Sequence, residues 1–111
     1  MLSITEQRRG SASILDLDGD LNEEGCQVLR KTLARLLNEK RYWLILNLEK
    51  VSFLGSHALG ILLFFDGQAR QGAGRLKLLK VQPMARMVLQ NTRTKFLLEV
   101  FESEDSAVAS F

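Results

Sequence analysis

The run from Tyr42 to Leu48 constrains the fold more than any other segment of this chain. It is short, consists largely of apolar and aromatic residues, and contains neither glycine nor proline. Such a run is typical of a strand that is buried on both of its faces. We therefore expect it to be the central strand of a sheet that is covered by helices.

An amphipathic helix precedes this strand. Asn22 can cap its amino end, and Glu23 and Glu24 place negative charge in the first turn, where the helix dipole favours it. Apolar residues then recur at spacings of three and four: Cys26, Leu29, Leu33 and Leu36. The pattern predicts a helix that ends near Lys40.

A second, more apolar helix follows the strand. Ser56 stands directly before the apolar run Ala58–Phe65, so we expect Ser56 to cap and open this helix. Leu62–Phe65 supplies more apolar side chains than one helical stripe needs. If one or two of them are exposed beside Ser56, they form a docking patch. The alternative is that all of them pack in the core. Gly72 and Gly74 end the helix.

Further segments have the pattern of strands. The segments near Leu2–Glu6 and over Ile14–Leu17 predict an amino-terminal hairpin whose first strand lies at an edge. Leu76–Val81 predicts a strand after the second helix, and Phe96–Phe101 predicts a short extended segment.

Two shorter helices are predicted in the last third of the chain. Pro83 starts one of them, because its fixed φ and missing amide suit a first turn, and Asn91 can end it. The acidic stretch Glu102–Asp105 leads into the other, Ala107–Phe111. Strands that alternate with helices predict an α/β fold with a central sheet.

Length and composition fit one globular domain spanning residues 1–111. The 15 Lys and Arg against 13 Asp and Glu leave a net charge of +2, too small for the basic field that nucleic-acid binding needs. The longest apolar run has about 8 residues, whereas a membrane span needs about 20. Met1–Gly10 has no secretory pattern, and the single cysteine, Cys26, suits a buried position in a reducing compartment. We therefore expect a cytoplasmic protein that neither enters membranes nor binds nucleic acid.

The segment Val51–Leu63, VSFLGSHALGILL, resembles the phosphoacceptor segment of bacterial anti-sigma factor antagonists, whose usual form is VSFxDSSGLGxLL. Two other stretches match in the same order. GDLNEEGCQVLRKTL resembles the G-x-L-D stretch and first helix of that family, and FLLEVFESEDSAV resembles its LFEVFDSEEEAL. Such a colinear pattern is more specific than any single motif. The chain thus resembles the STAS domain family, which implies a single α/β domain with a mixed sheet of about four to five strands flanked by about four to five helices.

The resemblance also implies a mechanism. In this family a partner, an anti-sigma factor with serine kinase activity, phosphorylates one serine and thereby dissociates the complex, and Ser56 has the position of that serine. The amino end of a helix tolerates a phosphate, and the added charge disrupts an apolar docking surface. The implied partner-binding residues are Gly19, Asp20, Leu21, Asn22, Gly55, His57, Leu59 and Gly60. A phosphatase is a second implied partner, no cofactor or metal is implied, and we expect a monomer or a weak homodimer.

The chain departs from the family pattern around Ser56. Gly55 stands where an acidic residue is usual, and His57 and Ala58 replace a serine and a glycine. The other departures are Asn22 and Asn47 in place of aspartates, and Arg93 and Thr94 in place of Gly and Leu. This loss of negative charge leaves an alternative open: a phosphorylation-independent STAS docking or scaffold subunit of a transporter or signalling assembly.

Simpler roles are expected for the remaining conspicuous residues. Ser56 and His57 are neighbours on a helix and do not face one another, so no catalytic pair and no enzyme are predicted. Dipole compensation accounts for the acidic residues near the first helix better than metal binding does; they are Asp18, Asp20, Glu23 and Glu24. We expect the basic side chains to be solvated, namely Arg30, Lys31, Arg35, Lys77 and Lys80.

Overall fold

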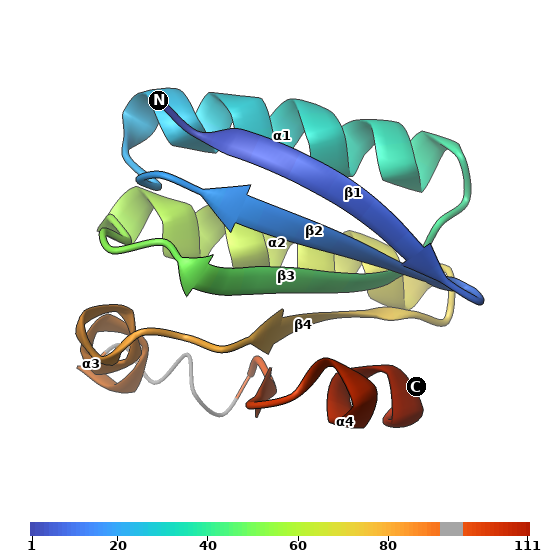
Figure 1. Ribbon diagram of the computed structural model, residues 1–111. Coiled ribbons are helices and arrows are strands. Elements are labelled where there is room, and N and C mark those ends of the chain that lie inside the picture. Colours follow the sequence, from blue (N-terminus) through green and yellow to red (C-terminus); the bar gives the residue numbers. More distant parts are fainter. Residues whose placement is uncertain (92–96) are drawn as a thin grey trace.

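The computed structural model describes residues 1–91 and 97–111. Five strands form one sheet in the order β1-β2-β3-β4-β5, which is also their order along the chain (Figure 1). β1 (Ser3–Arg9) pairs antiparallel with β2 (Ala12–Asp18). Parallel pairing continues from β2 to β3 (Trp43–Lys50), β4 (Arg75–Leu79) and β5 (Val100–Phe101). This mixed sheet confirms the predicted fold class, and β1 is an edge strand, as expected.

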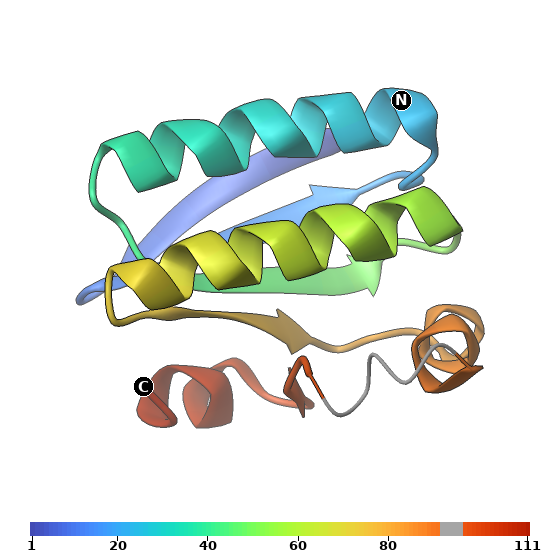
Figure 2. The same ribbon diagram turned by 180° about the vertical axis from the view of Figure 1, so that it is seen from behind.

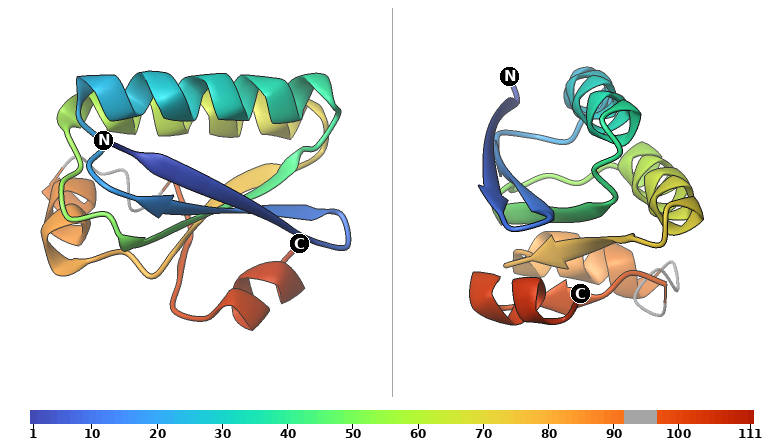
Figure 3. Two further views of the ribbon diagram at one scale, coloured as in Figure 1. Left: turned by 45° about the horizontal axis from the view of Figure 1, so that its top comes forward. Right: turned by 90° about the vertical axis from the view of Figure 1, so that its right-hand side faces the viewer.

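Four helices surround the sheet within the described residues. α1 (Glu23–Asn38) and α2 (Ser56–Gln71) lie side by side over one face (Figure 2). α3 (Pro83–Asn91) lies at the end of the sheet where the amino ends of α1 and α2 also lie, and α4 (Glu104–Ala109) packs on the opposite face from α1 and α2 (Figure 3). No helix of this described part combines the length and the apolarity that crossing a membrane requires.

β3 is buried on both faces, as its sequence predicts. Leu44, Leu46 and Leu48 are fully buried in the larger core, which fills the space between the sheet and the α1–α2 layer. Ile45 points the other way, into a smaller core that includes Ala107 of α4. Alternating side chains of one central strand therefore hold both helical layers.

Two predicted segments near the carboxyl end of the chain differ from the structure in their bounds. The last helix begins at Glu104 rather than Ala107, because the Ser103 hydroxyl accepts the amide of Ser106 at 3.2 Å and so caps the helix there. The predicted extended segment Phe96–Phe101 contains only the two-residue strand β5. Its first residue, and the departures Arg93 and Thr94, lie outside the described residues.

Lys77 is buried, so the prediction that it is solvated is wrong. Its side chain does point away from the larger core, but α4 covers that face, and the residue is only 3% exposed. The Lys77 ammonium donates to the Ser110 carbonyl at 3.1 Å and to the Ser110 hydroxyl at 2.7 Å. It also lies 4.3 Å from the centroid of the Phe111 ring, which stacks on Trp43. Burial of the charge is therefore compensated by hydrogen bonds and aromatic faces.

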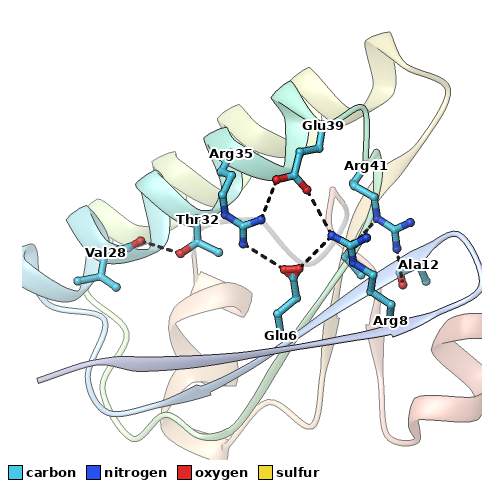
Figure 4. Close-up of polar contacts among 9 residues, drawn as sticks. Glu6, Arg8, Ala12, Val28, Thr32, Arg35, Glu39 and Arg41 are labelled. Atoms are coloured by element: carbon cyan, nitrogen blue, oxygen red, sulfur yellow. Dashed lines mark hydrogen bonds and ion pairs between the residues drawn. The ribbon is translucent and has the colours of Figure 1, made fainter.

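An ionic network joins the edge strand to α1 (Figure 4). The Glu6 carboxylate pairs with Arg35 at 3.0 Å and with Arg8 at 3.5 Å. Glu39 closes the ring by pairing with Arg35 at 3.0 Å and Arg8 at 3.3 Å. The hydrogen bond from Arg35 is the main cause that lowers the pKa of Glu6 below its ordinary value.

Candidate functional site

The amino end of α2 lies directly after β3 and the connecting segment Val51–Gly55. Gly55 is the N-cap residue, with φ −71° and ψ 156°, and its carbonyl accepts the Ala58 amide at 3.0 Å. Ser56 is the first helical residue, so Gly55 and not Ser56 holds the cap position. The prediction that Ser56 caps the helix is therefore wrong by one position. The cause is that the Gly55 amide donates to the Leu21 carbonyl at 3.2 Å, which holds Gly55 in an extended conformation outside the helix.

The β2–α1 loop lies alongside this connection. The Leu21 amide donates to the Phe53 carbonyl at 2.9 Å, and the Gly19 amide donates to the Lys50 carbonyl at 3.2 Å. Side chains add a third link, because the Ser52 hydroxyl donates to the Asp20 carboxylate at 3.2 Å. The structure therefore brings the predicted segments Gly19–Asn22 and Gly55–Gly60 together at the carboxyl ends of two parallel strands.

The start of α1 is fixed by Asn22 and Gly25. The Asn22 side chain accepts the Gly25 amide at 2.8 Å, which confirms Asn22 as the predicted cap. Gly25 packs closely against the preceding loop, since a Cβ on this residue would lie 2.1 Å from the Asp20 carbonyl oxygen. This close approach holds the Asp20 backbone against the first turn of α1.

Exposure divides the predicted partner-binding residues into two groups. The exposed or half-buried ones are Gly19, Asp20, Asn22, Gly55, Ser56, His57 and Gly60. Leu21 is 0% exposed and Leu59 is 5% exposed, so their side chains belong to the core. These two leucines support the surface from beneath rather than form part of it.

Two exposed aromatic side chains belong to this region, Phe53 just before the amino end of α2 and Phe64 about two turns further along the helix. Phe64 on α2 is 59% exposed, which fits the predicted excess of apolar residues on this helix. Phe53 in the preceding connection is 51% exposed and was not singled out from the sequence. The sequence signal that could have indicated an exposed Phe53 is its place between two other apolar residues, Val51 and Leu54. Both of these are buried in the structure. Isolated exposed apolar residues are ordinary, but Phe64 lines the same groove as Ser56, and an aromatic side chain in a groove suits a docking surface.

A groove of about 400 Å³ is lined by the first half of α2 and by one residue of α1. Its lining comprises Arg30, Ser56, His57, Gly60, Ile61, Phe64 and Phe65. Gly60 is one of the lining residues, and a Cβ on it would meet no atom within 4 Å. The lining contains a guanidinium, an imidazole and a hydroxyl but no carboxylate. Arg30 was expected only as a solvated side chain, and neither Arg30 nor Ile61 was assigned to the site from the sequence.

The chemistry of the site is that of an exposed hydroxyl beside aromatic and cationic side chains. Ser56 and His57 are successive helical residues and point in different directions around the helix axis. Across residues 1–91 and 97–111, no three His, Cys, Asp or Glu residues gather in a group that could hold a metal ion. The arrangement suits recognition by another protein and covalent modification of Ser56.

Comparison with known proteins gives a consistent result. The family described as the STAS domain matches residues 3–107. A protein of Bordetella bronchiseptica, BtrV, whose name describes it as an anti-sigma factor antagonist, is 24% identical over 110 residues, which cover 99% of this chain and 95% of that one. Both proteins are thus similar over nearly their full lengths.

Solved structures share the fold. An anti-sigma factor antagonist from Thermotoga maritima superposes with a TM-score of 0.90 at 18% identity, over 96% of this chain and 92% of that one. The Bacillus cell fate determinant SpoIIAA in its phosphorylated form superposes with a TM-score of 0.76 at 21% identity, over 97% of this chain and 98% of that one. The murine anion transporter Slc26a9 gives 0.77 at 16% identity, over 93% of this chain but only 18% of the transporter. At these identities the likeness shows a common fold.

Proposed function

Because this chain belongs to the STAS domain family, we propose that it is an anti-sigma factor antagonist that binds an anti-sigma factor with serine kinase activity. The proposed contact surface comprises the amino end of α2 and the adjoining β2–α1 loop. Phosphorylation of Ser56 is proposed to release the partner. The names of the similar proteins, BtrV and the Thermotoga antagonist, support the class of partner.

The observation that carries the proposal is the position of the Ser56 hydroxyl. It is exposed in the first turn of α2, it has no capping role, and it borders the loop that contains Asp20 and Asn22. A kinase can reach such a hydroxyl without unfolding the helix. The phosphorylated form of SpoIIAA, a protein of the same fold, makes modification in this class of protein a reasonable proposal.

The proposed reaction transfers one phosphoryl group from ATP. The Ser56 oxygen attacks the γ-phosphorus, a new O–P bond forms, and the bond between the γ-phosphorus and the β–γ bridging oxygen breaks. ADP leaves, and the hydroxyl proton passes to a base of the kinase. The product carries nearly two negative charges at the amino end of α2, in the groove that Phe64 also lines. Desolvation of that charge against an apolar contact disfavours the complex.

Mass spectrometry tests the proposal. The protein is first incubated with ATP and with an anti-sigma factor kinase whose gene lies near its own gene. Phosphate on Ser56 is the expected result, and it should disappear in Ser56→Ala. Ser52→Ala is a matched control, because Ser52 is an exposed serine of the same connection whose hydroxyl already donates to Asp20. No phosphate on Ser56, or phosphate on Ser52 instead, contradicts the proposal.

The alternative function is a docking subunit that is not switched by phosphorylation. The departure at Gly55 favours it, because the residue before Ser56 carries no carboxylate for a kinase to recognise. The presence of this fold within a transporter shows one setting for such a module. Pull-down of the partner by wild type and by Ser56→Asp separates the two. A switch predicts binding at least about tenfold weaker for Ser56→Asp, and a docking subunit with its contact elsewhere predicts little change.

A further inference from the structure

Arg30 differs from the other arginines of the described residues. Seven of the eight arginines in residues 1–91 and 97–111 have a hydrogen bond or ion pair; they are Arg8, Arg9, Arg35, Arg41, Arg70, Arg75 and Arg86. Arg30 has no such partner within these residues, although it lies on the same helix as Arg35. Its guanidinium is the one arginine charge of the described part of the chain that is left without a specific acceptor.

Arg30 faces the groove that contains the Ser56 hydroxyl. The two residues come from different helices, since Arg30 projects from α1 and Ser56 begins α2, and both line the same space of about 400 Å³. α1 and α2 run side by side with their amino ends at the same end of the molecule (Figure 2). Among the described residues, those that line this groove include no carboxylate that could neutralise Arg30, and the space next to Gly60 is open.

We propose that Arg30 receives the phosphoryl group of phosphorylated Ser56, so that the phosphate bridges α2 to α1 across the groove. A guanidinium presents paired N–H donors that match two oxygens of one phosphate, which an ammonium does not. The bridge covers the groove with an internal ion pair. Modification then closes part of the partner surface as well as adding charge to it. This inference rests on the proposed function only in taking Ser56 as the phosphoacceptor.

The test uses the full chain with phosphoserine inserted at position 56 during translation, followed by a pH titration of the phosphate by phosphorus NMR. A phosphoserine has a second pKa of about 6, and a paired cation lowers it. Arg30→Gln should raise the phosphate pKa by about half a unit or more relative to wild type. Lys31→Gln is the matched control, because Lys31 is an exposed neighbour on α1 that does not line the groove, and it should change the pKa much less.

His57 lines the same groove and carries a second cationic-capable side chain, so the phosphate titrations of all three chains are repeated with His57→Gln in each of them. Equal phosphate pKa values in wild type and Arg30→Gln overturn the inference, as do equal increases in Arg30→Gln and Lys31→Gln. A double-mutant cycle of Ser56→Glu with Arg30→Gln in urea unfolding gives a second measurement that needs no phosphoserine. A favourable coupling between the introduced carboxylate and Arg30 is expected, and an absent coupling counts against the inference.

The outcome is independent of the partner. No kinase takes part in this test. Failure of the kinase to modify Ser56 would therefore refute the proposed function, but the effect of Arg30→Gln on the phosphate pKa could still be interpreted. A normal phosphorylation by the kinase together with an unchanged phosphate pKa in Arg30→Gln would refute only the bridge.

Discussion

Gly25 and Gly60 both lie inside helices, but their surroundings differ. A Cβ on Gly25 would meet the Asp20 carbonyl oxygen at 2.1 Å, whereas a Cβ on Gly60 would meet nothing within 4 Å. Gly25→Ala should therefore lower the free energy of unfolding by about 2 kcal/mol or more, because backbone must move. Gly60→Ala should raise it by about 0.5–1 kcal/mol, because alanine favours the helix.

Urea unfolding followed by circular dichroism measures both changes. Gly67→Ala is the control for Gly60→Ala, since Gly67 is also an exposed α2 glycine with open space around it but does not line the groove. Both variants should be stabilised alike. A stabilised Gly25→Ala protein would show that the loop containing Asp20 is not held as described.

The buried Lys77 should matter for stability. Lys77→Ala removes the two hydrogen bonds to Ser110 and leaves a cavity beneath α4, so we expect the free energy of unfolding to fall by about 2–3 kcal/mol. Lys31→Ala, at an exposed helical position, should change it by less than about 0.5 kcal/mol. Equal effects of the two substitutions in thermal or urea unfolding would contradict the described burial.

Some features of single residues were predictable from the sequence and others were not. The cap at Asn22 was predictable, because it depends on side-chain chemistry next to the helix start. The burial of Lys77 was not, because it depends on α4, which packs over that face from the far end of the chain. Arg30 could not be assigned to the site either, since only the packing of α1 beside α2 brings it to the groove with Ser56.

At the scale of elements, the pairing of β1 with α1 should depend on pH. The folded-state pKa of Glu6 lies below its ordinary value of about 4.3, so its ionised form stabilises the fold. This contribution is present above the ordinary pKa and is lost as pH falls through the lowered folded-state pKa. Wild type should therefore unfold at higher urea concentration than Glu6→Gln at pH 7, and the difference should shrink below about pH 4.

Salt provides an independent check on the same network. The Glu6, Arg8, Arg35 and Glu39 side chains are at least partly exposed, so their interactions are screened by added salt. The difference between wild type and Glu6→Gln at pH 7 should become smaller in 1 M NaCl, a concentration at which the screening length is about 3 Å. A difference that changes with neither pH nor salt would point to packing rather than charge.

The elements themselves were mostly predictable, whereas some of their ends were not. Periodic apolar residues identified α1 and α2, and the apolar run at Tyr42–Leu48 identified β3. The start of α2 at Ser56 was predicted, but its cap was placed one residue too late, because the extended geometry of Gly55 depends on a hydrogen bond to Leu21, far away in the sequence. A serine before an apolar run favours a cap position, but this long-range contact decided which residue became the cap.

At the scale of the molecule, Cys26 can report opening of the larger core. The thiol is 1% exposed among residues of that core, and burial raises its pKa. Both effects reduce the reactivity of the native protein. We expect a thiol reagent to label the native chain at least about 100-fold more slowly than the urea-unfolded chain, with a rate that rises with urea. Rapid labelling without urea would mean that α1 opens locally, and Cys26→Ser controls for reaction elsewhere.

The order of the strands has a consequence for biosynthesis. Each strand of the sheet pairs with the strand that precedes it along the chain, from β1 to β5. A nascent chain emerging from the ribosome can therefore add each new strand to an edge that is already complete, with no need to insert a later strand between earlier ones. Short separations between pairing segments also favour rapid folding. Ribosome-bound chains from which α1 and β3 have fully emerged should already protect the β1–β2 hairpin from proteolysis, while β5, α4 and the buried lysine contact await the last residues.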